Sequence, residues 1–245
     1  WSEMKKQEWK PGNMLYPVPA VMVSCGREGE TPNIITVAWA GTICSDPAML
    51  SISVRPERYS YDILKETGEF VINLITRDLT YATDFCGVRS GRDVDKFAQM
   101  HLTPLPSQHI SAPGIAESPV NLECKVTQVI PLGSHDMFLA EVLGVTVDEK
   151  YMDENGKFHL NDAGLVAYSH GEYFELGEKL GKFGYSVAKK QAAKPESVTK
   201  SAKPSGAGKK VTSAENRTAS KTGAGNRRKS ASKTGSADKQ KSRRK

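Results

Sequence analysis

Apolar and polar residues alternate in short runs up to about residue 188, and Pro, Gly, Asn and Asp punctuate these runs. Short runs rich in Val and Ile that end at turn-forming residues are typical of β-strands. The predicted strands are Ala20–Cys25, Asn33–Ile43, Met49–Val54, Phe70–Leu74, Leu122–Leu132, Met137–Val147 and Leu165–Tyr168. Residues 133–136 separate the two longest late runs, which predicts a long hairpin with a four-residue turn.

Helical patterns are fewer and shorter than the strand patterns. Tyr59–Thr67 follows Pro56 and stops before Gly68, and such a start and stop are typical of a helix. Two further helices are predicted at Arg77–Phe85 and Asp93–Gln99. The order is therefore mainly β. It lacks the regular strand–helix alternation of a doubly wound sheet, which favours a barrel or a sandwich.

The composition changes abruptly at about Lys189. Residues 189–245 carry 18 Lys and Arg against 3 Asp and Glu, which leaves 16 basic and 25 acidic residues in 1–188. The net charge of +6 thus combines a tail of +15 with a body of −9. The tail has no aromatic residue, so we expect it to be disordered. It predicts sequence-independent binding of nucleic acid or another polyanion, or else a solubilising extension without a specific partner.

The body of 188 residues is long enough to bury one sizeable core without disulfides or metal ions. The four cysteines have no metal-ligand spacing, so we expect four reduced thiols and no metal site. No apolar run approaches the length of a membrane span, and no signal-peptide pattern is present. The sequence therefore predicts a soluble cytoplasmic protein without a membrane partner.

A short polar loop between a predicted strand and a predicted helix contains Arg55, Arg58 and Ser60. Two cations and a hydroxyl suit a phosphate, and a helix N-terminus adds free N–H groups and a favourable dipole. The alternative is that Ser60 only caps the helix and that Arg55 is a solvated strand end.

The predicted strand at Asn33–Ile43 places small residues around one large aromatic side chain. Thr36, Ala38 and Gly41 flank Trp39, and small side chains let a flat ligand approach the backbone. Trp39 is either a buried core residue or the neighbour of a planar ring. Asn33 is either a turn residue or a hydrogen-bond partner of that ring. With the polar loop, this segment predicts a planar, phosphorylated cofactor.

A second basic segment contains Arg89, Ser90, Gly91, Arg92 and Lys96. The two basic segments can converge on one phosphate. The alternative is a solvated loop in which neighbouring aspartates pair with the basic residues.

His135 lies in the predicted hairpin turn and Tyr168 at a strand end. The chain shows no Ser/His/Asp ordering, no HExxH, no Walker loop and no GxGxxG after a strand. We therefore expect no catalytic acid, base or nucleophile from the protein. If the protein is an enzyme, a bound cofactor carries the reactivity.

With these residues assembled, the chain over about residues 12–188 resembles the flavin reductase-like FMN-binding split-barrel family, and within it the flavoredoxin branch. The segments that carry the resemblance occur in the family's order. They are YPVPAVMVSCG, NIITVAWAGTICSDPAMLSISVRPERYSYDIL, GEFVINL, CGVRSGRDVDKF, the hairpin around His135, and FELGEKLGKFGYSV. The resemblance does not extend to the tail of residues 189–245.

The resemblance implies a six-stranded antiparallel split β-barrel with a few short helices, assembled as a homodimer with FMN at the subunit interface. Asn33, Thr36 and Trp39 match positions on the isoalloxazine side, where backbone groups from Ala38 onward are expected to fix polar atoms of the ring. Ser53, Arg55, Ser60 and Lys96 match positions that hold the ribityl and phosphate groups, and Ser90 supports that region. His135 and Tyr168 match positions near the flavin. Ser60 is often Thr in flavoredoxins and Tyr168 is often Phe, so this chain adds a hydroxyl at 168.

The implied activity is an FMN-dependent oxidoreductase. NAD(P)H is the expected electron donor, and a free flavin, a protein or a small molecule the acceptor. The alternative is a flavoredoxin-type electron carrier, in which a redox partner reduces bound FMN and NAD(P)H does not react directly.

Overall fold

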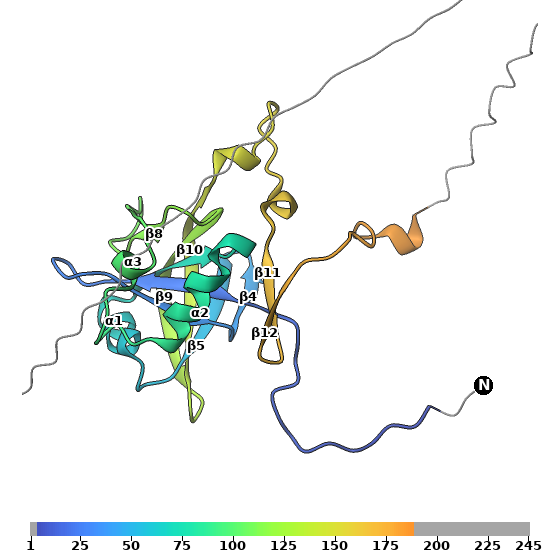
Figure 1. The fold of residues 1–245 in the computed structure, drawn as a ribbon, viewed down its shortest axis with the longest axis horizontal. Helices are drawn as coiled ribbons and strands as arrows, with labels where there is room; N and C mark the ends of the chain where they lie inside the picture. Colours follow the sequence, from blue (N-terminus) through green and yellow to red (C-terminus); the bar gives the residue numbers. More distant parts are fainter. Residues whose placement is uncertain (1–3, 189–245) are drawn as a thin grey trace, which may run out of the picture. The chain divides into compact units, whose positions relative to one another are not determined.

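The computed structural model describes residues 4–188 (Figure 1), so the predicted tail at 189–245 lies outside the described residues. The strands are β1 (Val18–Pro19), β2 (Val21–Cys25), β3 (Asn33–Val37), β4 (Ala40–Ser45), β5 (Ala48–Val54), β6 (Glu69–Leu74), β7 (Pro104–Leu105), β8 (Gly114–Ile115), β9 (Val120–Pro131), β10 (Asp136–Val147), β11 (Val166–Ser169) and β12 (Glu172–Glu175). The α-helices are α1 (Tyr59–Thr67), α2 (Thr80–Val88) and α3 (Lys96–Gln99), and the 3₁₀ turns are η1 (Arg77–Leu79), η2 (Glu149–Tyr151), η3 (Leu160–Ala163) and η4 (Tyr185–Val187).

The main sheet has the strand order β3-β2-β6-β9-β10-β5-β4, and every described strand pair is antiparallel. Its two outermost strands, β3 and β4, are consecutive in the chain. Only Ala38 and Trp39 connect them, so the end of β3 and the start of β4 are at most about 11 Å apart. A sheet whose two edges are this close must curl round on itself, which makes it a split barrel. The long hairpin of β9 and β10 supplies two neighbouring strands of this sheet (Figure 1).

The prediction of one strand over Asn33–Ile43 was wrong, because the chain changes sheet edge at Ala38 and Trp39. The carbonyl of Trp39 instead accepts a hydrogen bond from the N–H of Ser53 in β5, at 2.9 Å. A continuous apolar run does not reveal such a change of partner. The resemblance implied six strands, whereas the main sheet has seven, because the segment expected as one strand forms β3 and β4.

The concave side of the curled sheet is filled by large apolar side chains. Val23, Ile52, Phe70 and Phe138 are fully buried there, and Leu64 of α1 closes this core. Burial of each such side chain stabilises the fold by about 1.5–3 kcal/mol.

A second apolar core covers the other face of β2 and β3. Met22 and Ile34 point to this side, where they pack with Cys86 of α2 and Phe97 of α3. All five residues of β2 are buried for this reason, since the strand lies between the two cores. The position of α2 and α3 over β3 matters for the site, because loops next to these helices border it.

The predicted helices were found with shifted bounds in two of three cases. Tyr59–Thr67 is α1 as expected, and it ends at Gly68 with φ 64°. The predicted helix at Arg77–Phe85 is η1 followed by α2, and Asp93–Gln99 contracts to α3, whose N-cap is Asp95. No helix among the described residues is long and apolar enough to cross a membrane.

Candidate functional site

Two neighbouring cavities lie beside β3 and the start of α1, and Ile35 and Arg58 border both. The first cavity, of about 220 Å³, is lined by Tyr16, Ile35, Thr36, Val37, Ala38, Trp39, Ser53, Val54, Arg55, Arg58, His135 and Tyr168. The second, of about 160 Å³, is lined by Asn33, Ile35, Glu57, Arg58, Tyr59, Ser60, Cys86, Gly87, Arg89, Ser90, Gly91, Arg92 and Lys96.

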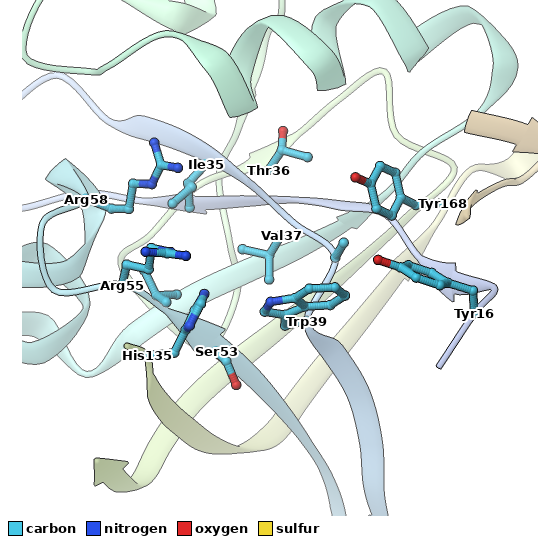
Figure 2. A pocket seen from close by; sticks show the side chains of 12 residues that line it. Tyr16, Ile35, Thr36, Val37, Trp39, Ser53, Arg55, Arg58, His135 and Tyr168 are labelled. Atoms are coloured by element: carbon cyan, nitrogen blue, oxygen red, sulfur yellow. The ribbon is translucent and has the colours of Figure 1, made fainter. Parts of the chain in front are cut away.

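The first cavity has an aromatic end and a cationic end, as Figure 2 shows. Trp39, Tyr16 and Tyr168 gather at the aromatic end. Arg55, Arg58 and His135 gather at the other end. Because Arg58 also borders the second cavity, the cationic end is the one that adjoins it.

The aromatic end is built by three segments far apart in the chain. The Tyr16 ring lies 6.3 Å from the Trp39 ring and 6.1 Å from the Tyr168 ring, measured between centroids. Trp39 is half-buried and lines the cavity instead of filling the core. Of the two roles open to Trp39, this placement favours contact with a ligand.

His135 occupies the β9–β10 turn at the cationic end. Burial lowers the pKa of His135 below its ordinary value, and the positive charge of Arg55 lowers this pKa further. The imidazole is therefore neutral at pH 7, with one nitrogen that donates and one that accepts. Its Nδ1 lies 2.9 Å from the Ser134 hydroxyl. Arg55 pairs with Glu57 at 3.5 Å, but both are exposed, and such pairs contribute little stability.

The second cavity lies at the N-terminus of α1. Its N-cap is Arg58, not Ser60, so the capping role considered for Ser60 was wrong. Ser60 is buried and accepts a hydrogen bond from Asn33 Nδ2 at 2.8 Å. Backbone N–H groups in the first turn of a helix have no intrahelical partner, and Arg58, Tyr59 and Ser60 bring that turn to the cavity wall.

Lys96 is the buried cation of the second cavity, with 3% of its surface exposed. Its Nζ donates to the carbonyl of Ile34 in β3 at 2.6 Å and to that of Cys86 in α2 at 2.8 Å. Burial lowers the pKa of Lys96 below 10.5. An ammonium group has three donors, so one remains for a further acceptor in the cavity.

The basic loop after α2 packs against the start of α1. Arg92 donates to the Glu57 carbonyl at 3.2 Å, and its guanidinium lies over the Tyr59 ring, 5.5 Å from the centroid. Gly91 is pressed between neighbours, since an added Cβ would lie 2.2 Å from Asn33 Oδ1 and 2.6 Å from Tyr59 Cδ1. Of the two arrangements left open for this loop, convergence on the first basic loop is the one observed, because Ser90 lines the same cavity.

Residues 13–177 match the family model described as "Flavin reductase like domain". The protein belongs to this family. Within this flavin reductase-like protein, no group of three or more His, Cys, Asp or Glu residues at 4–188 has an arrangement that could hold a metal ion.

Three similar proteins define the family context. Flavoredoxin of Desulfovibrio vulgaris (Miyazaki F) is 32% identical, with a TM-score of 0.70 over 75% of this chain and 100% of flavoredoxin. An FMN-binding protein from Thermus thermophilus is 24% identical, with a TM-score of 0.60 over 74% of this chain and 99% of that chain. NADPH-flavin oxidoreductase of Streptomyces viridifaciens is 26% identical over 125 residues, 50% of this chain and 63% of that protein. The expected family, its flavoredoxin branch and the mainly β split-barrel fold are confirmed.

All eleven residues that the sequence proposed as cofactor ligands border one of the two cavities of this flavin reductase-like domain. Around the first are Thr36, Ala38, Trp39, Ser53, Arg55, His135 and Tyr168. Around the second are Asn33, Ser60, Ser90 and Lys96. Asn33, expected on the same side as Trp39, lies at the second cavity, and Ser53 and Arg55, expected with Ser60 and Lys96, lie at the first. Their role in binding stays a prediction.

Further lining residues were not selected from the sequence, among them Arg58, Arg89 and Tyr16. Arg58 was noted in the basic loop but not selected, although it alone among the cations borders both cavities. Tyr16 begins the segment YPVPAVMVSCG, which carries part of the resemblance, but nothing in that segment indicated that its side chain would line the site. Its place next to Tyr168 depends on the antiparallel pairing of β1 with β11, in which Val18 opposes Tyr168.

Proposed function

We propose that the two cavities bind FMN, with the isoalloxazine ring in the first and the phosphate in the second. The observation that carries this proposal is that side chains of different chemical character line the opposite ends of the two adjoining cavities. Aromatic side chains line one end, cations and hydroxyls line the other, and Ile35 and Arg58 join the two cavities. A planar ring linked by a polar chain to a dianionic phosphate matches this order.

The donors of the second cavity fit a phosphate. Arg58 and Arg89 supply guanidinium groups, Ser90 supplies a hydroxyl, and Lys96 retains a third N–H. The first turn of α1 adds unpaired backbone N–H groups and the positive end of a helix dipole. Charge-assisted hydrogen bonds of this kind are about twice as strong as neutral ones.

The first cavity fits a flat ring with polar edges. Trp39 and Val37 provide apolar surface, and Ala38 borders the cavity beside them. The neutral imidazole of His135 and the hydroxyl of Ser53 supply polar groups. When bound, FMN supplies the redox chemistry, and the side chains bind it, orient it and limit its contact with water.

We further propose that the protein is an FMN-dependent oxidoreductase that takes electrons from NAD(P)H and passes them to a flavin, a protein or a small acceptor. The name of the NADPH-flavin oxidoreductase relative supports this donor. A flavoredoxin-type carrier, reduced by a redox partner, is the second candidate, and the 32% identity to flavoredoxin favours it. We expect the chain to act in the cytoplasm.

A homodimer is proposed as the assembled form. Three apolar side chains on strands of the main sheet are exposed, namely Ile43 of β4 and Leu143 and Val145 of β10. Single exposed apolar side chains are common on monomers, so the proposal is that these three together supply an apolar patch for a second copy of the chain. The molar mass of purified protein, measured by light scattering after gel filtration, tests this; the mass of one chain at all concentrations would rule it out.

One sample tests both whether the protein binds FMN and whether it is an oxidoreductase or an electron carrier. Purified protein is loaded with FMN, freed of excess ligand by gel filtration and kept anaerobic while NADH or NADPH is added. Retained flavin absorbance that bleaches with either nucleotide supports the oxidoreductase. Retained absorbance that bleaches only with a chemical reductant supports the carrier. A protein that retains no flavin and binds FMN only at millimolar concentration contradicts both proposals.

A further inference from the structure

An aromatic pair connects the first cavity to the surface of the domain. Tyr168 of β11 lines the aromatic end of that cavity (Figure 2), and Tyr173 of β12 lies directly opposite it in the antiparallel pairing of the two strands. The two ring centroids are 5.6 Å apart at an interplanar angle of 64°, so the rings are in edge-to-face contact. The Tyr173 hydroxyl donates to Oδ1 of Asp84 in α2 at 3.4 Å, and Asp84 is exposed. Two packed rings therefore extend from the cavity wall to the protein surface.

The aromatic pair ends at the outer side of α2. Tyr81, Asp84 and Val88 follow one another at spacings of three and four residues, so they share one side of this helix. Tyr81 and Val88 are 77% and 71% exposed, so two large apolar side chains flank one exposed carboxylate. We call these three residues the α2 face. Apolar side chains beside charged ones are the ordinary composition of a protein-docking surface.

The charges on the elements around the α2 face are mainly negative. Asp78 of η1, Asp84 of α2 and Glu175 of β12 are all exposed. Arg77 is the only cation on these three elements, and it already pairs with Glu175. Arg89, which follows α2, lines the second cavity. The surface at which the aromatic pair ends is therefore complementary to a positively charged partner.

We propose that the α2 face docks a basic protein with a one-electron metal centre, and that electrons pass between that centre and FMN through Tyr168 and Tyr173. The inference rests on the proposed function, because it names the class of protein acceptor for the same site. Reduced FMN loses two electrons singly to two partner molecules, each oxidised centre gains one, and the two protons of the reduced flavin pass to water. The tyrosines are not oxidised. Their packed rings replace water between flavin and partner, and electrons tunnel more readily through packed atoms than through a water-filled gap.

Cytochrome c, a basic haem protein that takes up one electron, is the probe for the docking surface. The full-length protein is loaded with FMN, reduced anaerobically with stoichiometric dithionite and mixed with oxidised cytochrome c at low salt in a stopped-flow instrument. Asp84→Asn and Tyr81→Ala should each slow the second-order reduction of cytochrome c about 2- to 5-fold, the equivalent of one exposed contact. Glu28→Gln is the matched control, because Glu28 is exposed in the β2–β3 turn, at the end of β2 remote from β1 and β11. Every variant keeps the basic tail, so the charge of the tail cancels when rates are compared.

Substitution of Tyr173 tests the electron path separately from docking. At saturating cytochrome c, Tyr173→Leu should slow electron transfer several-fold, whereas Tyr173→Phe keeps the ring and should retain the wild-type rate. Ferricyanide is a small one-electron acceptor that reaches the flavin without docking. The ratio of the cytochrome c rate to the ferricyanide rate therefore isolates the path, and this ratio should fall in Tyr173→Leu alone.

Four results would overturn the proposal. FMN-loaded wild type that does not reduce cytochrome c, or equal rates in wild type, Asp84→Asn and Tyr81→Ala, would exclude the docking surface. An unchanged ratio in Tyr173→Leu, or an equal fall in Tyr173→Phe, would exclude the path through the rings. Wild type that retains no FMN would instead refute the proposed function. Calorimetric titration of the FMN-free protein with cytochrome c would then still decide the docking surface, since wild type should bind more tightly than Asp84→Asn and equal affinities would overturn it.

Discussion

Replacing Lys96 with methionine removes the ammonium group that joins β3 to α2 and keeps a side chain of similar length. Two buried carbonyls, those of Ile34 and Cys86, then lose charged donors at 2.6 and 2.8 Å. A hydrogen bond to a charged group contributes about 1.5–3 kcal/mol, and relief from burying the charge offsets part of that loss. We expect the free energy of unfolding to fall by roughly 2–4 kcal/mol, which lowers Tm by roughly 5–15 °C for a domain of this size.

The same substitution should weaken FMN binding, because Lys96 lines the second cavity and one of its three N–H donors has no protein acceptor. Loss of one charge-assisted hydrogen bond to phosphate weakens binding about 10- to 100-fold. Thermal unfolding of the protein without FMN measures the first effect, and fluorescence titration with FMN measures the second. Lys125→Met, at an exposed position of β9, is the control.

The difference in unfolding free energy between wild type and Lys96→Met should depend on pH, which gives a second check on the role of the Lys96 ammonium. Burial lowers its pKa in the folded protein below 10.5, so between that lowered value and 10.5 the unfolded chain binds more protons. The contribution of Lys96 to stability therefore rises with pH through this window, and the gap between wild type and Lys96→Met should widen towards pH 10.5. A variant as stable as wild type would refute the structural role. A destabilised variant with unchanged FMN affinity would show that Lys96 does not bind the phosphate.

Three further predictions use other parts of the chain. Gly91→Ala should destabilise the fold by about 1–3 kcal/mol and weaken FMN binding, because the new Cβ would displace the buried Asn33 side chain. Chemical denaturation measures the loss of stability. Gly41→Ala is the control, because no atom lies within 4 Å of the Cβ that it adds. Burial raises the pKa of Cys86 to about 11, so the contribution of this thiol to stability is complete below pH 9 and is lost as pH rises through 11. Between pH 9 and pH 11 the unfolding midpoint of Cys86→Ala should therefore fall less steeply with pH than that of wild type. An equal fall in the two proteins would contradict this. A chain ending before Lys189 should bind FMN like the full chain but no longer be retained on DNA at low salt; undiminished retention would exclude a role for the tail.

The sequence predicted the elements whose signals are local. The helix at Tyr59–Thr67 was predicted from Pro56 before it and Gly68 after it, and Gly68 adopts the left-handed conformation that glycine tolerates best. The hairpin of β9 and β10 was likewise visible as two long runs around one turn. The break at Ala38–Trp39 was not visible, because the partner strands of β3 and β4 are set by the closure of the whole sheet.

The candidate site was predictable where its residues cluster in the chain. Arg55, Ser60 and Ser90 were selected from short polar segments at or beside helix ends. Ser60 and Ser90 border the second cavity together, whereas Arg55, expected beside Ser60, borders the first. The part that could not be predicted depends on long-range packing. Tyr16 reaches the site only through the pairing of β1 with β11, and Lys96 is buried only because α2 and α3 pack over β3.

We propose that the two cavities together hold one FMN between the aromatic end and the cationic end. Equilibrium dialysis of wild type, Trp39→Ala and Arg58→Ala against FMN measures this binding. We predict one FMN per wild-type chain with a Kd in the micromolar range or below, and about 10-fold or greater weakening in each variant. Binding of the wild type only at millimolar FMN, or unchanged affinity in both variants, would show that the two cavities are not the FMN site.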